Sequence, residues 1–105
     1  MNVVVLHVAT EQARAAAVWY DEQEPGVGAE LLSEYHSVLE NIAQNPERYP
    51  FAETVDVRFG IRSARMHRFP YAMYYEIRVD HVLVLAVSHG VQRPNYWFRR
   101  RKLNP

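Results

Sequence analysis

The chain of 105 residues contains no cysteine. Disulfide bonds, thiolate nucleophiles and zinc sites built on cysteine are therefore excluded, and the composition fits a reducing compartment. No hydrophobic run approaches the roughly 18 residues that a transmembrane helix needs. The first six residues lack the basic leader of a secretory signal. We therefore expect a cytoplasmic protein without a membrane segment.

Metal-ligand patterns are also missing. The histidines His7, His36 and His81 show no ligand spacing with one another, so we expect no metal site. Neither sign of charge is in excess, because 12 basic residues balance 12 acidic ones. The balance hides a division, however: residues 1–53 hold nine acidic and two basic residues, whereas residues 54–105 hold three acidic and ten basic ones. This division predicts a basic surface for phosphate or an acidic protein, unless the two halves neutralise each other.

What is present is enough for one folded domain over residues 1–105, because 49% of the residues are hydrophobic. Asn2–His7 has the composition of a short strand. A first helix is predicted to begin at an N-cap on Thr10 and to end before Pro25-Gly26. Apolar residues at helical spacing then predict a second helix over about Gly28–Asn45, packed against the first as a hairpin.

After the second helix the hydrophobic period changes from 3.6 to 2 residues. Strands are predicted over Val55–Phe59 and Ile61–Phe69, followed by a hairpin of Tyr71–Val79 and Val82–Ser88. The last of these runs is apolar on both alternating faces, which is typical of a central strand covered on both sides. The sequence thus predicts an α+β fold: a short N-terminal strand, an antiparallel helical hairpin, then a four-stranded, mainly antiparallel sheet.

Basic residues follow one predicted strand. Arg62, Arg65 and Arg68 would track phosphates or form a solvated edge, and strict alternation puts Arg65 on the face opposite the other two. The central strand ends at His89. A histidine there suits general acid catalysis, but it would equally cap the strand by bonding to the loop before Pro94.

Several motifs, taken in order, resemble the RelE/ParE toxin superfamily. They are Trp19-Tyr20, Gly26-Val27-Gly28, Asn45-Pro46, Tyr49-Pro50, Phe69-Pro70-Tyr71, Tyr74-Tyr75, Ala86–His89 and Arg93–Trp97. The resemblance spans nearly the whole chain. It implies the toxin of a type II toxin–antitoxin module, which needs no cofactor and is neutralised by a small antitoxin protein.

The superfamily contains two mechanisms. RelE-like members are mRNA endonucleases that act on the ribosome, whereas ParE-like members poison DNA gyrase without doing chemistry. RelE-like members place an arginine where this chain has Ala72, and two lysines where it has Ser63 and Arg65. With Ala72 in place of that arginine, the chain lacks a cation that would stabilise charge on the scissile phosphate. This absence favours the ParE-like, plasmid-stabilisation branch, whose members arrest growth by poisoning gyrase.

The alternatives stay open at this point. If the chain is a ribosome-dependent nuclease, the resemblance implies Arg65, His89, Arg93 and Tyr96 as its working residues. A degenerate, non-toxic relative is the third possibility, so the sequence does not decide whether the protein is an enzyme.

For binding to the target or the antitoxin, a larger set of residues is expected. The resemblance implies that an acidic, partly apolar antitoxin segment crosses the basic sheet in a toxin–antitoxin hetero-oligomer. The contact residues expected are Arg62, Arg65, Arg68, Arg93, Trp97 and Arg100.

Overall fold

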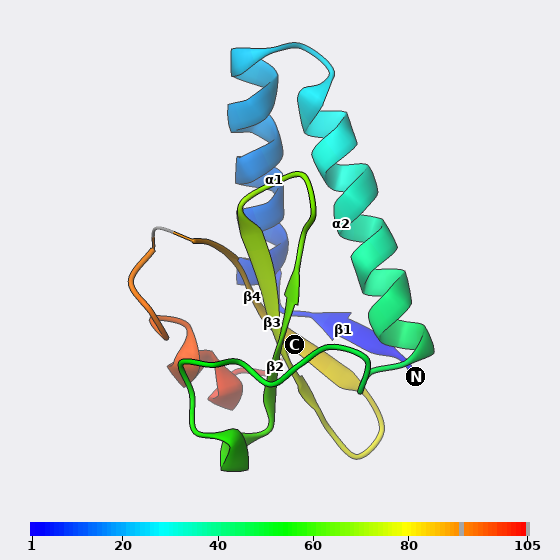
Figure 1. The fold of residues 1–105 in the computed structure, drawn as a ribbon, viewed down its shortest axis with the longest axis vertical. Coiled ribbons are helices and arrows are strands. Elements are labelled where there is room, and N and C mark those ends of the chain that lie inside the picture. The colour runs from blue at the N-terminus through cyan, green and yellow to red at the C-terminus, as the bar shows by residue number, and fades with distance from the viewer. Residues whose placement is uncertain (91, 105) are drawn as a thin grey trace.

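A computed structural model describes residues 1–90 and 92–104 of the chain. Its elements are β1 (Val3–Val5), α1 (His7–Gln23), α2 (Val27–Gln44), β2 (Ile61–Arg65), β3 (Tyr71–Ile77) and β4 (Val82–His89), with the 3-10 helices η1 (Val57–Phe59) and η2 (Phe98–Lys102) (Figure 1). The four strands form one sheet in the order β1-β4-β3-β2. β1 is parallel to β4, and the other neighbours are antiparallel. The predicted α+β class and mainly antiparallel sheet are confirmed.

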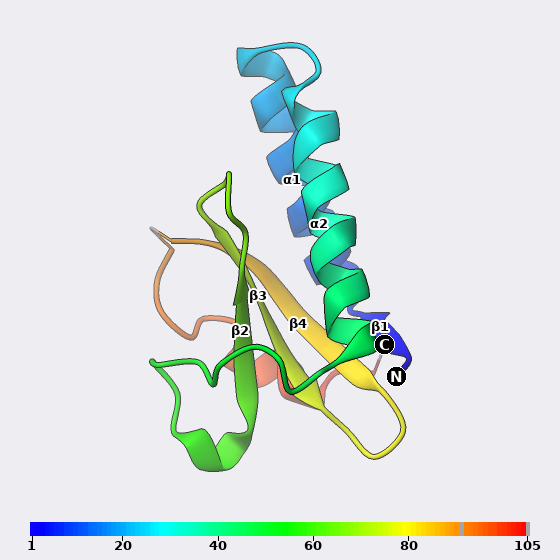
Figure 2. The same ribbon diagram turned by 45° about the vertical axis from the view of Figure 1, so that its right-hand side comes forward.

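β4 is the central strand, as its sequence predicts. Residues 82–88 are all buried, because the strand has a neighbour on each edge and is covered on both faces. The helical hairpin packs on one face, with α1 against β4 (Figure 2). The segment after β4 crosses the other face, where Trp97 stacks on Tyr74 with ring centroids 4.6 Å apart. Adjacent strand residues point to opposite faces, so Tyr74 lies under this segment while Tyr75 lies under the helices.

The helical hairpin depends on two glycines and one carboxylate. Gly26, which precedes α2, has a φ of 94°, a left-handed conformation that favours glycine. Both its N–H and that of Gly28 donate to Oδ1 of Asp21, at 3.1 and 2.8 Å. A Cβ on Gly28 would lie 2.3 Å from the carbonyl oxygen of Ala17. The absence of a side chain therefore sets how closely α2 approaches the buried alanine face of α1.

The predicted strand over Val55–Phe59 is wrong. Residues 57–59 form η1 because the Asp56 carboxylate accepts a hydrogen bond from the Arg58 N–H at 3.0 Å and Gly60 takes a φ of 69°. The alternating apolar residues do not mark a buried face, since Val57 is 58% exposed. The fourth strand of the sheet is β1, at the edge beyond β4.

Three predicted boundaries also move. α1 begins at His7 with Leu6 at the N-cap position, so Thr10 lies inside the helix. β2 stops at Arg65, and residues 66–70 form a loop that approaches α2 through hydrogen bonds from the N–H groups of His67 and Arg68 to the Glu34 carboxylate. β3 ends at Ile77, so four residues join it to β4, closed by Arg78 N–H to His81 C=O at 2.8 Å.

The outer edge of β2 is partly covered by the chain itself. The Ala52 N–H donates to Ile61 C=O at 2.8 Å, and the Ser63 N–H donates to Pro50 C=O at 3.0 Å. Residues 50–52 therefore occupy the backbone positions that an added strand would use beside Ile61–Ser63.

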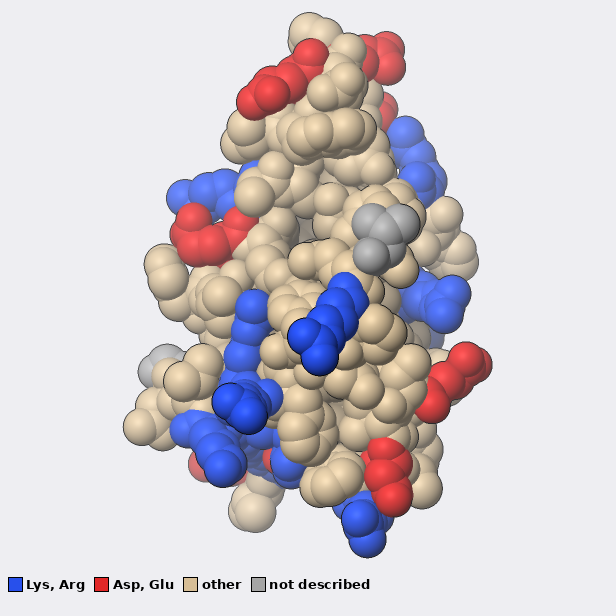
Figure 3. Space-filling model, turned by 90° about the vertical axis from the view of Figure 1, so that its left-hand side faces the viewer, with Lys and Arg blue, Asp and Glu red and all other residues tan. Residues whose placement is uncertain are grey.

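The charge division predicted from the sequence persists on the surface. Figure 3 shows Asp and Glu side chains gathered at the tip of the helical hairpin and several Lys and Arg side chains on the lower half of that face. Arg68 of the basic half pairs with Glu30 of the acidic half at 3.0 Å, but Arg78 and Arg101 pair with Glu76 of their own half. No hydrogen bond or ion pair with another described residue involves the side chains of Arg65, Arg93, Arg99 and Lys102, which are all exposed. The two halves thus neutralise each other only in part. Among the described residues no helix is long and apolar enough to cross a membrane.

Candidate functional site

A cavity of about 410 Å³ lies on the sheet face opposite the helices, where β4 ends and β3 begins. Its lining includes Arg65, Ala72, Tyr74, His89 and Arg93. No carboxylate is among the described residues that line it. The cavity therefore presents cations and neutral polar groups to solvent, which suits an anionic ligand.

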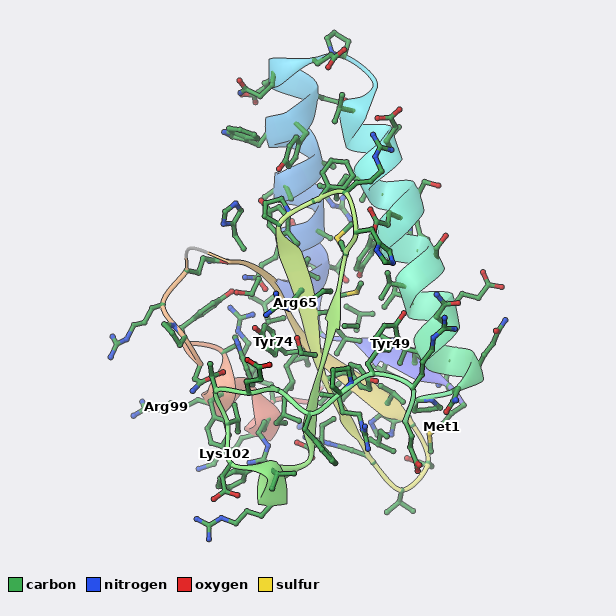
Figure 4. The ribbon with its side chains drawn as sticks, in the orientation of Figure 1. Met1, Tyr49, Arg65, Tyr74, Arg99 and Lys102 are labelled. Atoms are coloured by element: carbon green, nitrogen blue, oxygen red, sulfur yellow. The ribbon has the colours of Figure 1, made fainter. Side chains whose placement is uncertain are left out.

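Arg65 lies at the end of β2, opposite Ala72 in the register with β3 (Figure 4). The Ala72 side chain ends at Cβ, and Tyr74, on the same face of β3, lines the cavity together with Arg65. Strand alternation puts Arg65 on the face opposite Arg62, as predicted; this is the face away from the helices, and the Arg65 side chain is exposed.

His89 ends β4 opposite Tyr71, and the two rings meet edge to face with centroids 5.0 Å apart. Its backbone N–H donates to Oε1 of Gln92 at 2.7 Å. The strand end is therefore tied to the loop before Pro94, although this bond uses the backbone of His89. Burial, followed by the charge of Tyr20, raises the pKa of the neighbouring Tyr71 above its ordinary value.

Three of the four nuclease candidates share this cavity. Arg65, His89 and Arg93 all line it, whereas Tyr96 does not. The Tyr96 hydroxyl accepts a hydrogen bond from Nε2 of Gln12 on α1. Oε1 of the same Gln12 accepts from the Val87 N–H at 3.1 Å and from Nη1 of Arg100 at 2.9 Å. Tyr96 thus connects the C-terminal segment to α1.

Of the residues expected to bind a partner, Arg62 and Arg68 lie outside the cavity. Nη1 of Arg62 donates to Tyr49 C=O at 2.7 Å, and its guanidinium lies 4.1 Å from the ring centroid of Phe51. Arg68 pairs with Glu30 beside α2. The three arginines of this stretch therefore form no continuous row: Arg62 and Arg65 alternate on β2 as predicted, but Arg68 lies in the loop after the strand.

Trp97 and Arg100, also expected at a binding surface, are held against the sheet. Trp97 is 1% exposed, so its side chain is not accessible in this conformation. Arg100 donates to Leu85 C=O at 3.1 Å as well as to Gln12. Both residues hold the C-terminal segment on the sheet, and Trp97 also lines the cavity.

A second cavity, of about 280 Å³, adjoins the first. The two share Thr54, Arg65 and Tyr74, and the second also contacts Phe51 and His67. Sequence reasoning missed Thr54 and Phe51 because both lie in an irregular loop without periodicity. Thr54 is held by two bonds to Asn95: its Oγ1 donates to Oδ1 at 2.8 Å, and the Asn95 amide donates to Thr54 C=O at 2.7 Å.

The described residues contain no group of three or more His, Asp or Glu side chains able to hold a metal ion. The site therefore consists of two joined cavities with Arg65 between them, walled by the segment from Gln92 to Trp97 and by the loop around Thr54.

Comparison with known proteins identifies the family. Residues 3–94 match the family model described as the ParE toxin of the type II toxin–antitoxin system, parDE. No curated protein matches. Among solved structures, one of the chromosomal ParDE toxin–antitoxin system from P. aeruginosa matches with a TM-score of 0.72 and 13% sequence identity, over 85% of this chain and 95% of that chain. That similarity shows a shared fold, and the family match extends over most of the sequence. The chain therefore belongs to the ParE toxin family of type II toxin–antitoxin systems.

Proposed function

We propose that this protein is a cytoplasmic toxin that arrests growth by binding DNA gyrase and poisoning it, without catalysing a reaction itself. Family membership supports the role of toxin. The choice of gyrase rests on the resemblance to ParE-like members and on what the candidate site lacks.

The observation that carries the proposal is the position of Ala72. It lies on the cavity floor opposite Arg65, where RelE-like nucleases are expected to hold an arginine against the scissile phosphate. Preorganised charges of this kind contribute about 3–4 kcal/mol each to a transition state. Cleavage through a 2′-hydroxyl also needs a general base and a general acid. His89 is the single histidine, and no carboxylate is present, among the described residues that line this first cavity; the adjoining cavity has His67 and Glu53.

Ribosome-dependent mRNA cleavage is the second candidate, and one observation favours it. Arg65, His89 and Arg93 come from two strands and a loop, yet they line the same cavity. In that mechanism the two arginines would bind phosphate and His89 would transfer a proton.

Expression in growing bacteria separates the two candidates. A gyrase poison arrests growth with filamentation and DNA damage signalling, while primer extension finds translated messages intact. Cuts in messages at the ribosomal A site, abolished by Arg65→Ala or His89→Ala, would instead establish the nuclease. Unimpaired growth at high toxin levels would mean a non-toxic relative.

Membership of a type II family implies an antitoxin partner. We propose that its acidic, partly apolar segment covers the exposed cations Arg65 and Arg93 in a hetero-oligomer. Exposed ion pairs contribute only about 0–1 kcal/mol each, so apolar contacts should dominate the affinity. Isothermal titration with the antitoxin should therefore show modest weakening at higher salt; complete loss of binding in moderate salt would contradict this account.

A further inference from the structure

We propose that the 3-10 helix η2 binds the phosphate backbone of duplex DNA through the side chains of Arg99 and Lys102. This contact goes beyond the proposed function, in which the toxin binds gyrase and needs no DNA contact of its own. The surface lies outside the two joined cavities, because neither residue lines them.

The first face of η2 is directed at the sheet. Each turn of a 3-10 helix contains three residues, so side chains at positions i and i+3 lie on the same face. Trp97, at the N-cap position of η2, and Arg100 are such a pair. Trp97 is buried, and Arg100 donates to Leu85 C=O at 3.1 Å and to Oε1 of Gln12 at 2.9 Å.

The second face, formed by Phe98 and Arg101, is directed at η1. The Phe98 and Phe59 rings meet edge to face with centroids 5.0 Å apart, and the Arg101 guanidinium lies 5.2 Å from the Phe59 centroid. Nε of Arg101 also donates to Oε2 of Glu76 at 2.7 Å. Two of the three faces of η2 therefore contact the rest of the protein and fix the helix in place.

The third face, formed by Arg99 and Lys102, is directed at solvent. Both side chains are exposed, and neither forms a hydrogen bond or ion pair with another described residue. A rise of about 2 Å per residue separates the two by about 6 Å along the helix. Figure 4 shows both on the outer side of the C-terminal segment. Because the backbone that carries these cations is already ordered, binding a ligand costs less conformational entropy.

The carboxylate that contacts η2 does not offset these two charges. Glu76 pairs with Arg78 at 3.3 Å as well as with Arg101, so one negative charge meets two positive ones. Arg93, earlier in the same segment, is likewise exposed and forms no ion pair with a described residue. Figure 3 shows several Lys and Arg side chains on this face of the molecule. The segment therefore presents an excess of positive charge, which attracts an anionic partner.

Duplex DNA fits this surface better than a single strand or a peptide does. Proteins bind single strands through aromatic rings on which bases stack, but Trp97 is buried and Phe98 packs on Phe59. An acidic, partly apolar peptide needs a groove, and Arg99 and Lys102 line neither cavity. A duplex carries one charge per about 1.7 Å of its length, and its backbone is bound by accessible cations alone.

Fluorescence anisotropy of a labelled duplex of about 20 base pairs tests the proposal with the toxin alone. Two duplexes of different sequence, a single strand of the same length and a polyglutamate peptide are compared at about 50 mM salt. We expect both duplexes to bind saturably and with equal affinity, more tightly than the single strand or the peptide. With two phosphate contacts, log K should fall with log salt with a slope of about −1.8.

Variants locate the surface. The double variant Arg99→Ala, Lys102→Ala should weaken duplex binding at least tenfold and bring the salt slope close to zero, because both phosphate contacts are lost. Arg99→Lys should bind within about threefold of wild type, since a backbone contact depends on charge and reads no base. The matched control is Arg14→Ala, Arg48→Ala, which removes two exposed cations from the other half of the chain. It changes the net charge equally and should alter binding less than about twofold.

No duplex binding at this salt concentration, or equal losses in the two double variants, would overturn the proposal. Tighter binding of the single strand or of polyglutamate would overturn it too, by showing that another class of partner fits the surface better. If gyrase is inhibited while the duplex does not bind, only this inference is wrong; if the duplex binds while gyrase is unaffected, only the proposed function is.

Discussion

A single residue, Gly28, sets how closely the two helices pack. Gly28 has no space for a side chain: its Cβ would lie 2.3 Å from the Ala17 carbonyl oxygen and 2.7 Å from Cγ of Asp21. In Gly28→Ala the better helix propensity of alanine, about 1 kcal/mol, is outweighed by this overlap with backbone. We expect a net loss of about 1–3 kcal/mol of unfolding free energy, measured by urea denaturation.

Gly26→Ala is the comparison for that variant. Nothing lies within 4 Å of a Cβ on Gly26, so only the strain of its left-handed φ remains, about 1–2 kcal/mol. Equal stability of Gly28→Ala and wild type would show that the hairpin adjusts freely.

The Tyr75 phenol is a second residue whose environment has a measurable consequence. The side chain is buried under the helices, and its hydroxyl donates to Pro46 C=O at 2.6 Å. Burial raises its pKa to about 12, against about 10 in an unfolded chain. The unfolded state therefore releases the proton first as pH rises, and stability from this group is intact below pH 10 and lost through pH 12.

Tyr75→Phe should separate the two effects. At neutral pH it loses about 1 kcal/mol with the hydrogen bond. Between pH 10 and 12 its unfolding free energy should fall less steeply than that of wild type, so the two curves converge. Parallel curves from denaturation at several pH values would mean that Tyr75 ionises freely in the folded state.

At the scale of elements, the C-terminal segment acts as a cover for one sheet face. It is held by Trp97 stacked on Tyr74, by Arg100 on the Leu85 carbonyl, and by Arg101 on Glu76 at 2.7 Å. Trp97→Ala removes a fully buried ring and should cost about 3–5 kcal/mol. Arg99→Ala, in the same segment but exposed, should stay within about 0.5 kcal/mol of wild type.

Thermal or chemical denaturation of those two variants tests this assignment, and binding adds a second readout. If Trp97 were a contact for a partner, Trp97→Ala would weaken binding while leaving stability unchanged. The buried position instead predicts that its effect on binding follows from a loosened segment.

Several elements are predictable from the sequence, for physical reasons. The run Val82–Val87 has no polar face, and only a central strand covered on both sides suits it. The buried alanines of α1 and the Pro25-Gly26 break likewise define the hairpin. The run Val55–Phe59 has the alternating pattern of a strand, but its apolar residues are not buried on one face. Asp56 and Gly60 make residues 57–59 a 3-10 helix, and the alternation of apolar residues does not reveal their effect.

For the whole molecule, the site is less predictable than the fold. Alternation correctly put Arg65 and Arg62 on opposite faces of β2, whereas Arg68 lies in the loop after the strand. A role for His89 in the site stays a prediction. A run of three consecutive aromatic residues does not reveal which one is buried, so the sequence does not single out Trp97 from Tyr96 and Phe98. The joining of the two cavities depends on the pair Thr54–Asn95, 41 residues apart, and on a left-handed φ of 62° at Asn95. Contacts of this kind arise only from tertiary structure.

Purified DNA gyrase offers the most direct measurement of the central claim, that this ParE-family toxin acts on gyrase without catalysis of its own. The toxin is titrated into a supercoiling reaction, and products are scored for supercoiled and linear DNA. A gyrase poison should cause a concentration-dependent loss of supercoiling with accumulation of cleaved DNA, and the antitoxin should reverse both effects. Unchanged supercoiling at saturating toxin, with translation halted by the same preparation, would contradict it.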